Sequence, residues 1–162
     1  MNYLANKFYI GSGIGVGNTR INAFDNALLD AGVGNYNLVR LSSILPIQAA
    51  EHQVSKVDLP LGSLLPIAYA EITSYEVGVT ASAAIAIGIP KDKSKCCVIM
   101  EYESLGEDEN EAVLKVVKMI QDGFEHRGWE IERIISSGVS DAPEVAGEKV
   151  CAFACLAEWS DE

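Results

Sequence analysis

Two stretches of the chain place apolar residues at helical spacing. In residues 19–31, Ile21, Phe24 and Leu28 recur at positions i, i+3 and i+7, between a threonine suited to capping and a glycine suited to ending a helix. Residues 108–127 carry a longer stripe, which ends at another glycine and consists of Val113, Val116, Val117, Ile120 and Phe124. We therefore predict two amphipathic helices.

Strand-like patterns occupy much of the remaining chain, at residues 38–42, 64–74, 80–87, 95–102, 129–136 and 150–159. Apolar and polar residues alternate most clearly in the last two. Residues 81–87 are apolar throughout, which is typical of a central strand covered on both faces. Because the helices and strands do not alternate regularly along the chain, the pattern predicts an α+β fold in a single domain, residues 1–162.

Three polar segments are expected to be loops: residues 48–57, 104–110 and 137–147, the last of them the most mobile. Residues 11–17 contain four glycines but match neither the spacing of a dinucleotide-binding loop nor the lysine-hydroxyl ending of a nucleotide-binding loop. We interpret them as a flexible or tightly turned glycine loop.

The formal net charge of −11 argues against binding to nucleic acid or to an anionic membrane surface, since both rely on basic residues. No uncharged stretch reaches the roughly 20 residues of a membrane-spanning helix, and the amino-terminal segment lacks the pattern of a signal peptide. We therefore expect a cytoplasmic protein.

The four cysteines do not suggest a metal site or a disulfide. Cys151 and Cys155 lie in one predicted strand, where four residues separate them by roughly 13 Å. Cys96 and Cys97 are expected to point to opposite faces of their strand. We expect no metal and interpret the cysteines as small buried side chains.

The Ser42-Ser43 pair follows a predicted strand and carries a possible chemistry of its own. A serine hydroxyl can attack the carbonyl of the preceding peptide bond, and elimination from the resulting ester leaves a ketone in place of an amino terminus. Serine pairs, however, usually cap or turn the backbone, so the pair alone does not decide between these interpretations.

The neighbouring residues extend this signal over most of the chain. They read Asn22-Ala23-Phe24-Asp25, Asn37-Leu38-Val39-Arg40-Leu41-Ser42-Ser43-Ile44-Leu45-Pro46, Ile89-Pro90-Lys91-Asp92-Lys93-Ser94, Met100-Glu101-Tyr102-Glu103, Gly123-Phe124-Glu125, Arg127-Gly128-Trp129-Glu130 and Cys151-Ala152-Phe153-Ala154. Taken in this order, from Asn22 to Trp159, they resemble the pyruvoyl-dependent arginine decarboxylase family.

The resemblance implies a four-layer αββα sandwich, assembled as a homotrimer of cleaved protomers. It implies that Ser43 is the precursor of a covalent pyruvoyl cofactor and that cleavage between Ser42 and Ser43 leaves fragments 1–42 and 43–162. It also implies that L-arginine is the small-molecule substrate, decarboxylated through a Schiff base to agmatine and CO2. Side chains alone supply no such electron sink.

The resemblance assigns roles to further residues. Asn37 would stabilise the oxyanion of self-cleavage, although by itself it reads as a polar residue that binds local backbone at a strand entry. Glu101 and Glu103 share a strand face, and the resemblance selects Glu101 as the general acid, with Cys97 and Ile99 desolvating it.

For substrate binding, the resemblance implies that Asp25 accepts the guanidinium group, with Ser42 as a supporting contact. The alternative interpretation of Asp25 is an ordinary exposed aspartate of a helix. Two other functions stay open. One is a pyruvoyl-dependent decarboxylase of another amino acid, such as histidine. The other is a trimeric interaction protein that is neither processed nor an enzyme.

Overall fold

The computed structural model describes residues 3–161, and within them it confirms a single α+β domain with two helices and two sheets. The helices are α1 (Arg20–Asp30) and α2 (Glu109–Arg127), and a short 3-10 helix, η1, spans Ile47–Ala49. The strands are β1 (Lys7–Gly17), β2 (Asn37–Arg40), β3 (Ile44–Leu45), β4 (Leu64–Ser74), β5 (Ala81–Pro90), β6 (Cys97–Leu105), β7 (Ile131–Asp141) and β8 (Lys149–Trp159).

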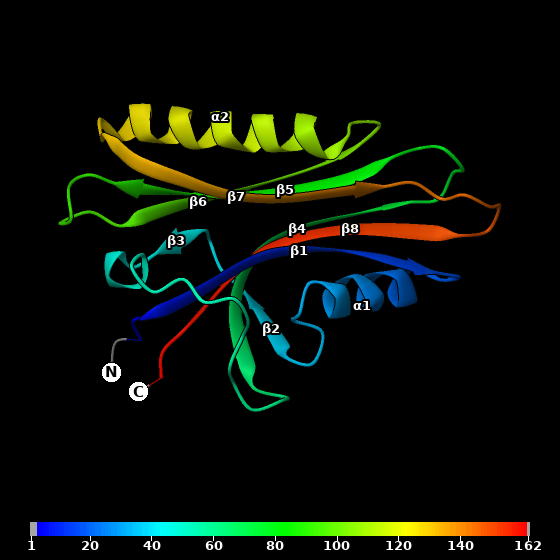
Figure 1. The fold of residues 1–162 in the computed structure, drawn as a ribbon, viewed down its shortest axis with the longest axis horizontal. Coiled ribbons are helices and arrows are strands. Elements are labelled where there is room, and N and C mark those ends of the chain that lie inside the picture. Colours follow the sequence, from blue (N-terminus) through cyan, green and yellow to red (C-terminus); the bar gives the residue numbers. More distant parts are fainter. Residues whose placement is uncertain (1–2, 162) are drawn as a thin grey trace.

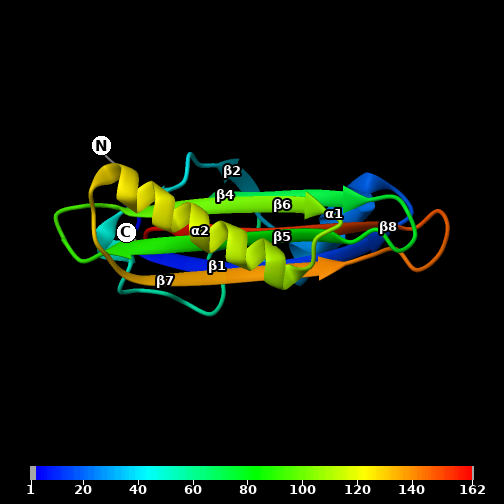
Figure 2. The same cartoon turned by 90° about the horizontal axis from the view of Figure 1, so that it is seen from above.

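The strands form two four-stranded sheets. The first sheet has the order β1-β8-β4-β2 and the second has the order β3-β6-β5-β7. All neighbouring strands are antiparallel except β2 and β4, which are parallel. The sheets face each other, with α1 on the outer side of the first and α2 on the outer side of the second (Figure 1). Seen from above, α2 crosses the strands of its sheet diagonally (Figure 2).

Apolar residues fill the space between the sheets and the space beneath each helix. Every residue of β5 is buried, which confirms the prediction of a central strand covered on both faces. The alternation expected for residues 150–159 is not seen, because all residues from Val150 to Trp159 are buried. Strand β8 is covered by the second sheet on one face and by α1 on the other, so both sets of side chains lie inside.

The glycine-rich segment is the clearest correction to the sequence analysis: residues 11–17 are not a loop but most of strand β1. Gly13, Gly15 and Gly17 lie directly against the backbone of α1. A Cβ atom added at Gly15 would lie 1.9 Å from the carbonyl oxygen of Ala23, and one at Gly13 would lie 2.5 Å from that of Ala27. The glycines therefore allow the helix to approach the strand more closely than any side chain would permit.

The face that α1 buries also differs from the prediction. Thr19 caps the helix as expected, and its buried residues are Ala23, Ala27 and Leu28. Ile21 is 67 % exposed, so the expected apolar face is wrong at that position. The close approach to the glycines of β1 selects small residues for the contact.

Helix α2 follows the prediction closely. Asp108 caps it in a capping box, Val116, Ile120 and Phe124 are among its buried residues, and Gly128 ends it in the left-handed conformation. None of the helices within residues 3–161 is long and apolar enough to cross a membrane.

The predicted loops are shorter than expected. Residues 137–141 belong to β7 and pair with β5, so only residues 142–148 connect β7 to β8. Residues 104–105 end β6, which leaves residues 106–108 before α2. The two-residue strand β3 escaped prediction, and its pairing with β6 brings the chain that follows Ser43 onto the second sheet.

Candidate active site

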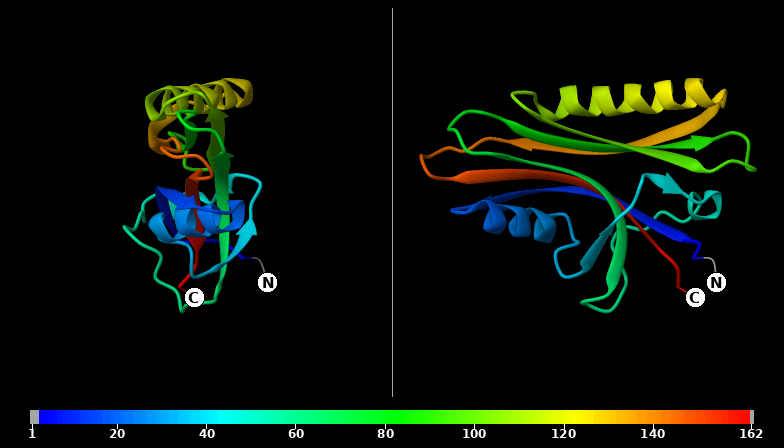
Figure 3. Two further views of the ribbon diagram at one scale, coloured as in Figure 1. Left: turned by 90° about the vertical axis from the view of Figure 1, so that its right-hand side faces the viewer. Right: turned by 180° about the vertical axis from the view of Figure 1, so that it is seen from behind.

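The Ser42–Ser43 peptide bond lies where the chain passes from one sheet to the other. On its amino-terminal side, the N–H of Leu41 donates to the carbonyl oxygen of Ile67 in the first sheet, at 2.9 Å. On its other side, the carbonyl oxygen of Ser43 accepts from the N–H of Ile99 in the second sheet, also at 2.9 Å. The bond is therefore anchored on both sides, each to a different sheet, as the path from β2 to β3 shows (Figure 3).

Ser43 has an unusual backbone conformation. Its φ is 75°, and among residues 3–161 it is the one residue other than glycine with a positive φ. For a residue with a side chain this conformation costs about 1–2 kcal/mol. Strain of this kind persists only where the surrounding structure imposes it, and it is frequent at functional sites.

The hydroxyl of Ser43 donates to the carboxylate of Glu101, with Oγ 2.9 Å from Oε2 and 3.1 Å from Oε1. Glu101 projects from β6 at the position paired with Ile85 of β5. Burial raises the pKa of the Glu101 carboxyl, the hydrogen bond from Ser43 and the positive charge of Arg40 oppose this shift, and the charge of Glu103 adds to it. Glu101 is thus biased towards its protonated form.

Glu103 lies two residues further along the same strand and is exposed. It has no contact with Ser43 among the hydrogen bonds of the described residues. The hydrogen bonds to Ser43 thus distinguish two glutamates that strand periodicity alone could not.

Asn37 is the first residue of β2 and anchors that strand. Its side-chain Nδ2 donates to the carbonyl oxygen of Gly62 at 2.7 Å, and its backbone N–H donates to that of Ser63 at 2.9 Å. These bonds fit the alternative of a polar residue that binds local backbone at a strand entry. The assigned role in oxyanion stabilisation stays a prediction.

Asp25 lies on the exposed side of α1, and none of the hydrogen bonds or ion pairs within residues 3–161 joins it to Ser43 or Glu101. Helix α1 and strand β3 lie towards opposite ends of the molecule (Figure 1). The structure therefore brings Ser43 and Glu101 together but does not bring Asp25 to them within this chain. Ser42, which is exposed, precedes the bond as expected.

Arg40 is a component of this site to which sequence reasoning assigned no role. Its guanidinium carbon lies 4.4 Å from the centre of the Tyr69 ring, and its Nη2 donates to the carbonyl oxygen of Tyr69 at 2.9 Å. The sequence shows that an arginine lies three residues before Ser43, but it does not show that this arginine contacts Tyr69 of β4.

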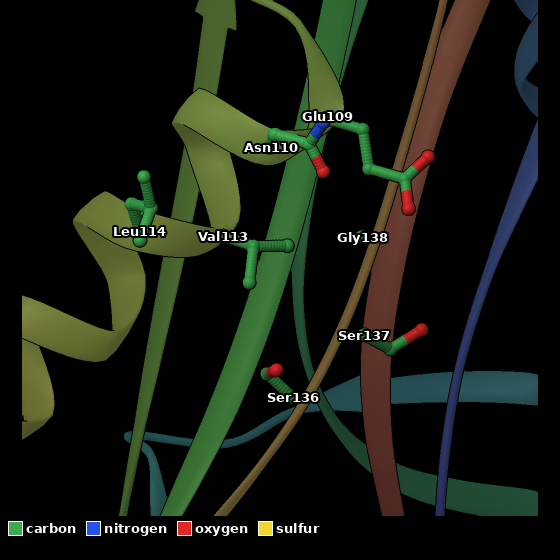
Figure 4. A pocket seen from close by; sticks show the side chains of 7 residues that line it. All are labelled: Glu109, Asn110, Val113, Leu114, Ser136, Ser137 and Gly138. Atoms are coloured by element: carbon green, nitrogen blue, oxygen red, sulfur yellow. The ribbon is translucent and has the colours of Figure 1, made fainter.

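Two surface hollows are present in the described part of the chain. A groove of about 650 Å³ lies between the start of α2 and strand β7, as Figure 4 shows, and is lined by Glu109, Asn110, Val113, Leu114, Ser136, Ser137 and Gly138. A smaller, more apolar hollow of about 360 Å³ is lined by Tyr3, Val39, Leu59, Ser63, Leu64, Pro66, Trp159 and Ser160. Neither contains Ser43 or Glu101, so neither marks the reacting bond.

The cysteines are free thiols, and Cys97, Cys151 and Cys155 are buried. Burial raises the pKa of Cys97 and of Cys155 to about 12 and that of Cys151 to about 11, so these thiols stay protonated at neutral pH. Within residues 3–161, no group of three or more histidine, cysteine or acidic side chains has the arrangement of a metal site.

Known proteins resemble this chain over most of its length. A family model described as pyruvoyl-dependent arginine decarboxylase matches residues 7–157. The pyruvoyl-dependent arginine decarboxylase of Methanocaldococcus jannaschii is 48 % identical over 96 % of this chain and 91 % of its own. The protein of the same name from Thermococcus kodakarensis is 45 % identical over 91 % of this chain and 94 % of its own. The chain therefore belongs to the pyruvoyl-dependent arginine decarboxylase family, an enzyme family, which confirms the resemblance seen in the sequence.

Proposed function

We propose that this chain cleaves itself between Ser42 and Ser43 and that the processed protein decarboxylates L-arginine to agmatine and CO2. The observation that carries the proposal is the state of Ser43: a strained serine, held between two sheets, whose hydroxyl donates to a half-buried carboxyl group. Membership of a family named for arginine favours this substrate over histidine and argues against an interaction protein without activity.

In the self-cleavage, Oγ of Ser43 attacks the carbonyl carbon of Ser42. A new C–O bond forms, the C–N bond of the peptide breaks, and the proton of the hydroxyl passes to the nitrogen. Loss of the Cα proton of residue 43 then expels the Ser42 carboxylate and completes fragment 1–42. Water hydrolyses the remaining enamine with release of ammonia, which leaves a ketone at the start of fragment 43–162.

The residues present fit the formation of a pyruvoyl group at position 43. The precursor is a serine, its hydroxyl is held by a hydrogen bond to Oε2 of Glu101 at 2.9 Å, and its positive φ is a strain that cleavage relieves. When formed, the group supplies the electron sink that decarboxylation of an amino acid needs. Glu101, whose pKa is raised by burial, is then positioned to protonate the α-carbon after CO2 leaves.

Asn37 is proposed to stabilise the oxyanion that forms on the Ser42 carbonyl. Its Nδ2 already donates one proton to Gly62, and an amide nitrogen carries two. The second proton is the one available for this role.

Substrate binding is proposed to involve two protomers of a homotrimer, because Asp25 lies far from Ser43 within one chain. Strands β2 and β3, on either side of the Ser42–Ser43 bond, are both at sheet edges, and their Val39 and Ile44 are exposed. Such edges suit contact with a second protomer, whose Asp25 would accept the guanidinium group, with Ser42 as a supporting contact. The helix and sheet contacts likewise support the four-layer αββα sandwich implied by the sequence.

The substrate assignment is tested by Asp25→Asn, which keeps the shape of the side chain and removes its charge. We expect self-cleavage to be intact and the apparent affinity for arginine to fall by about 10- to 100-fold, as loss of a charged hydrogen-bonded pair predicts. Asp122→Asn, at an exposed position of α2, is the control. Agmatine release is measured across arginine concentrations. Unchanged affinity in Asp25→Asn would remove Asp25 from the site, and release of histamine from histidine in place of agmatine from arginine would refute the substrate.

A further inference from the structure

The pairing of β2 with β4 ends just before the Ser42–Ser43 bond. The two strands pair in parallel from Asn37 opposite Leu64 to Arg40 opposite Ile67, and the N–H of Leu41 donates to the carbonyl of Ile67. Donors in a parallel ladder recur at every second residue. A continued β2 would therefore bring the N–H of Ser43 to the carbonyl oxygen of Tyr69.

The side chain of Arg40 takes that acceptor instead. Its Nη2 lies 2.9 Å from the carbonyl oxygen of Tyr69, and its guanidinium group lies over the Tyr69 ring. The Tyr69 ring packs in turn against Phe153 of β8, with ring centres 5.3 Å apart. Arg40 thus satisfies the carbonyl of β4 that the chain leaves free as it departs from the sheet, and it links the end of β2 to the Tyr69–Phe153 pair of the first sheet.

We propose that Arg40 is a positioning residue. Its side chain donates to the carbonyl of Tyr69 in place of the Ser43 N–H, so the Ser42–Ser43 bond is held in the strained conformation in which it is cleaved. This inference rests on the proposed self-cleavage. Without Arg40, the carbonyl of Tyr69 would be free to draw the N–H of Ser43 back into the first sheet, in competition with the bonds of Ser43 to Ile99 and Glu101.

Arg40 also acts on Glu101 through its charge. The charged groups that influence the Glu101 carboxyl are Arg40 from β2, which lowers its pKa, and Glu103 from its own strand, which raises it. Ile85, opposite Glu101 on β5, is uncharged. Removal of Arg40 therefore raises the pKa of Glu101, whereas removal of the Glu103 charge lowers it.

Two variants separate the two effects. Arg40→Met removes both the hydrogen bond and the charge, while Arg40→Lys keeps the charge but lacks the planar group that stacks on Tyr69 and bonds its carbonyl. Full-length chains made in a cell-free reaction are followed on denaturing gels after synthesis is stopped. We expect self-cleavage to be about tenfold slower or more in Arg40→Met and to be slowed in Arg40→Lys as well. Cleavage of both at the wild-type rate would overturn the proposal.

The processed fractions supply a readout that a general loss of packing would not produce. Agmatine release requires protonated Glu101, so it falls as pH rises through the pKa of that group. This fall should occur at higher pH in Arg40→Met, at lower pH in Glu103→Gln and near its wild-type position in Arg40→Lys. An unmoved profile in Arg40→Met would refute the electrostatic effect.

The outcomes remain interpretable if one variant misfolds or if the proposed function fails. Melting curves identify misfolding, and in that case the cleavage rate of Arg40→Lys decides. A wild-type chain that never cleaves would refute the proposed function itself, whereas a wild-type chain that cleaves no faster than folded Arg40 variants would refute only the role of Arg40.

Discussion

At the scale of single residues, burial separates two glutamates that the sequence presents as equivalents. Glu101 and Glu103 share one face of β6, yet Glu101 is half-buried beside Ser43 and Glu103 is exposed. Burial is the largest influence on the Glu101 carboxyl and raises its pKa. A proton donor for carbon needs to hold its proton near working pH, and this location provides that condition.

We predict that Glu101→Gln loses turnover by about 10²- to 10⁴-fold, because an amide cannot deliver the proton. The amide oxygen still accepts the hydroxyl of Ser43, so the variant should fold and assemble. Glu103→Gln is the matched control and should retain turnover at pH values below the pKa of Glu101. Steady-state agmatine release from processed protein checks both, and a reversed pattern would show that Glu103 is the acid.

A second carboxyl group affects stability rather than catalysis. Glu158, near the end of β8, is 5 % exposed, and its Oε2 is buried without a hydrogen-bond partner in the described part of the chain. Burial raises its pKa to about 7. Because the folded chain binds this proton more tightly than the unfolded chain does, the stabilisation is complete below the ordinary pKa, near pH 4.5, and is lost as pH rises through about 7.

We predict that the wild-type free energy of unfolding falls by an amount on the order of 2 kcal/mol as pH rises from 4.5 to 7.5, and that this fall is absent in Glu158→Gln. Urea unfolding of wild type, Glu158→Gln and the exposed control Glu103→Gln over this range measures the effect. The same slope with pH in wild type and Glu158→Gln would contradict the assignment.

At the scale of elements, β1 and α1 form one unit through small residues. The glycines of β1 meet Ala23 and Ala27 of the helix, and two polar side chains of α1 bind the free edge of the strand. Asn26 donates to the carbonyl of Val16, and Asp30 accepts from the N–H of Ile14, both at 2.8 Å. The helix thereby covers a strand edge that would otherwise be open to pairing.

Gly15→Ala should destabilise the fold by about 1–3 kcal/mol, because its Cβ would lie 1.9 Å from a backbone carbonyl that cannot move alone. Gly123→Ala in α2 is the control, since the nearest atoms are the Cε of Met100 at 2.9 Å and the Nη1 of Arg127 at 3.5 Å, both at the ends of flexible side chains. Thermal unfolding of both compares them. Equal stability of the two variants would refute the close packing of β1 against α1.

The same elements show how far the sequence leads. Helix α2 and strand β4 were predictable because their patterns are long and their ends carry caps or turns. Strand β1 was not predictable, since its glycines have no side chains from which an alternation can be read. These glycines are needed because helix α1 packs directly against them. The resemblance named Ser43 and Glu101, but the positive φ of Ser43 depends on bonds to two sheets formed by distant residues.

At the scale of the whole molecule, the proposed cleavage divides the chain without dividing the fold. Fragment 1–42 contains β1, α1 and β2. Strand β1 pairs with β8 along its whole length, from Lys7 opposite Trp159 to Gly17 opposite Lys149, and β2 pairs with β4. The small fragment therefore supplies both outer strands of the first sheet, and we expect it to stay bound after the bond is cut.

Intact mass spectrometry of the purified protein tests the central claim most directly. Under denaturing conditions we predict two species, residues 1–42 with a free carboxylate and residues 43–162 lighter by one ammonia than their sequence, while under native conditions the two remain together. Ser43→Ala should give one species of full length, because no hydroxyl remains to attack. A wild-type protein that releases agmatine while it carries an uncut chain with unmodified Ser43 would contradict the account.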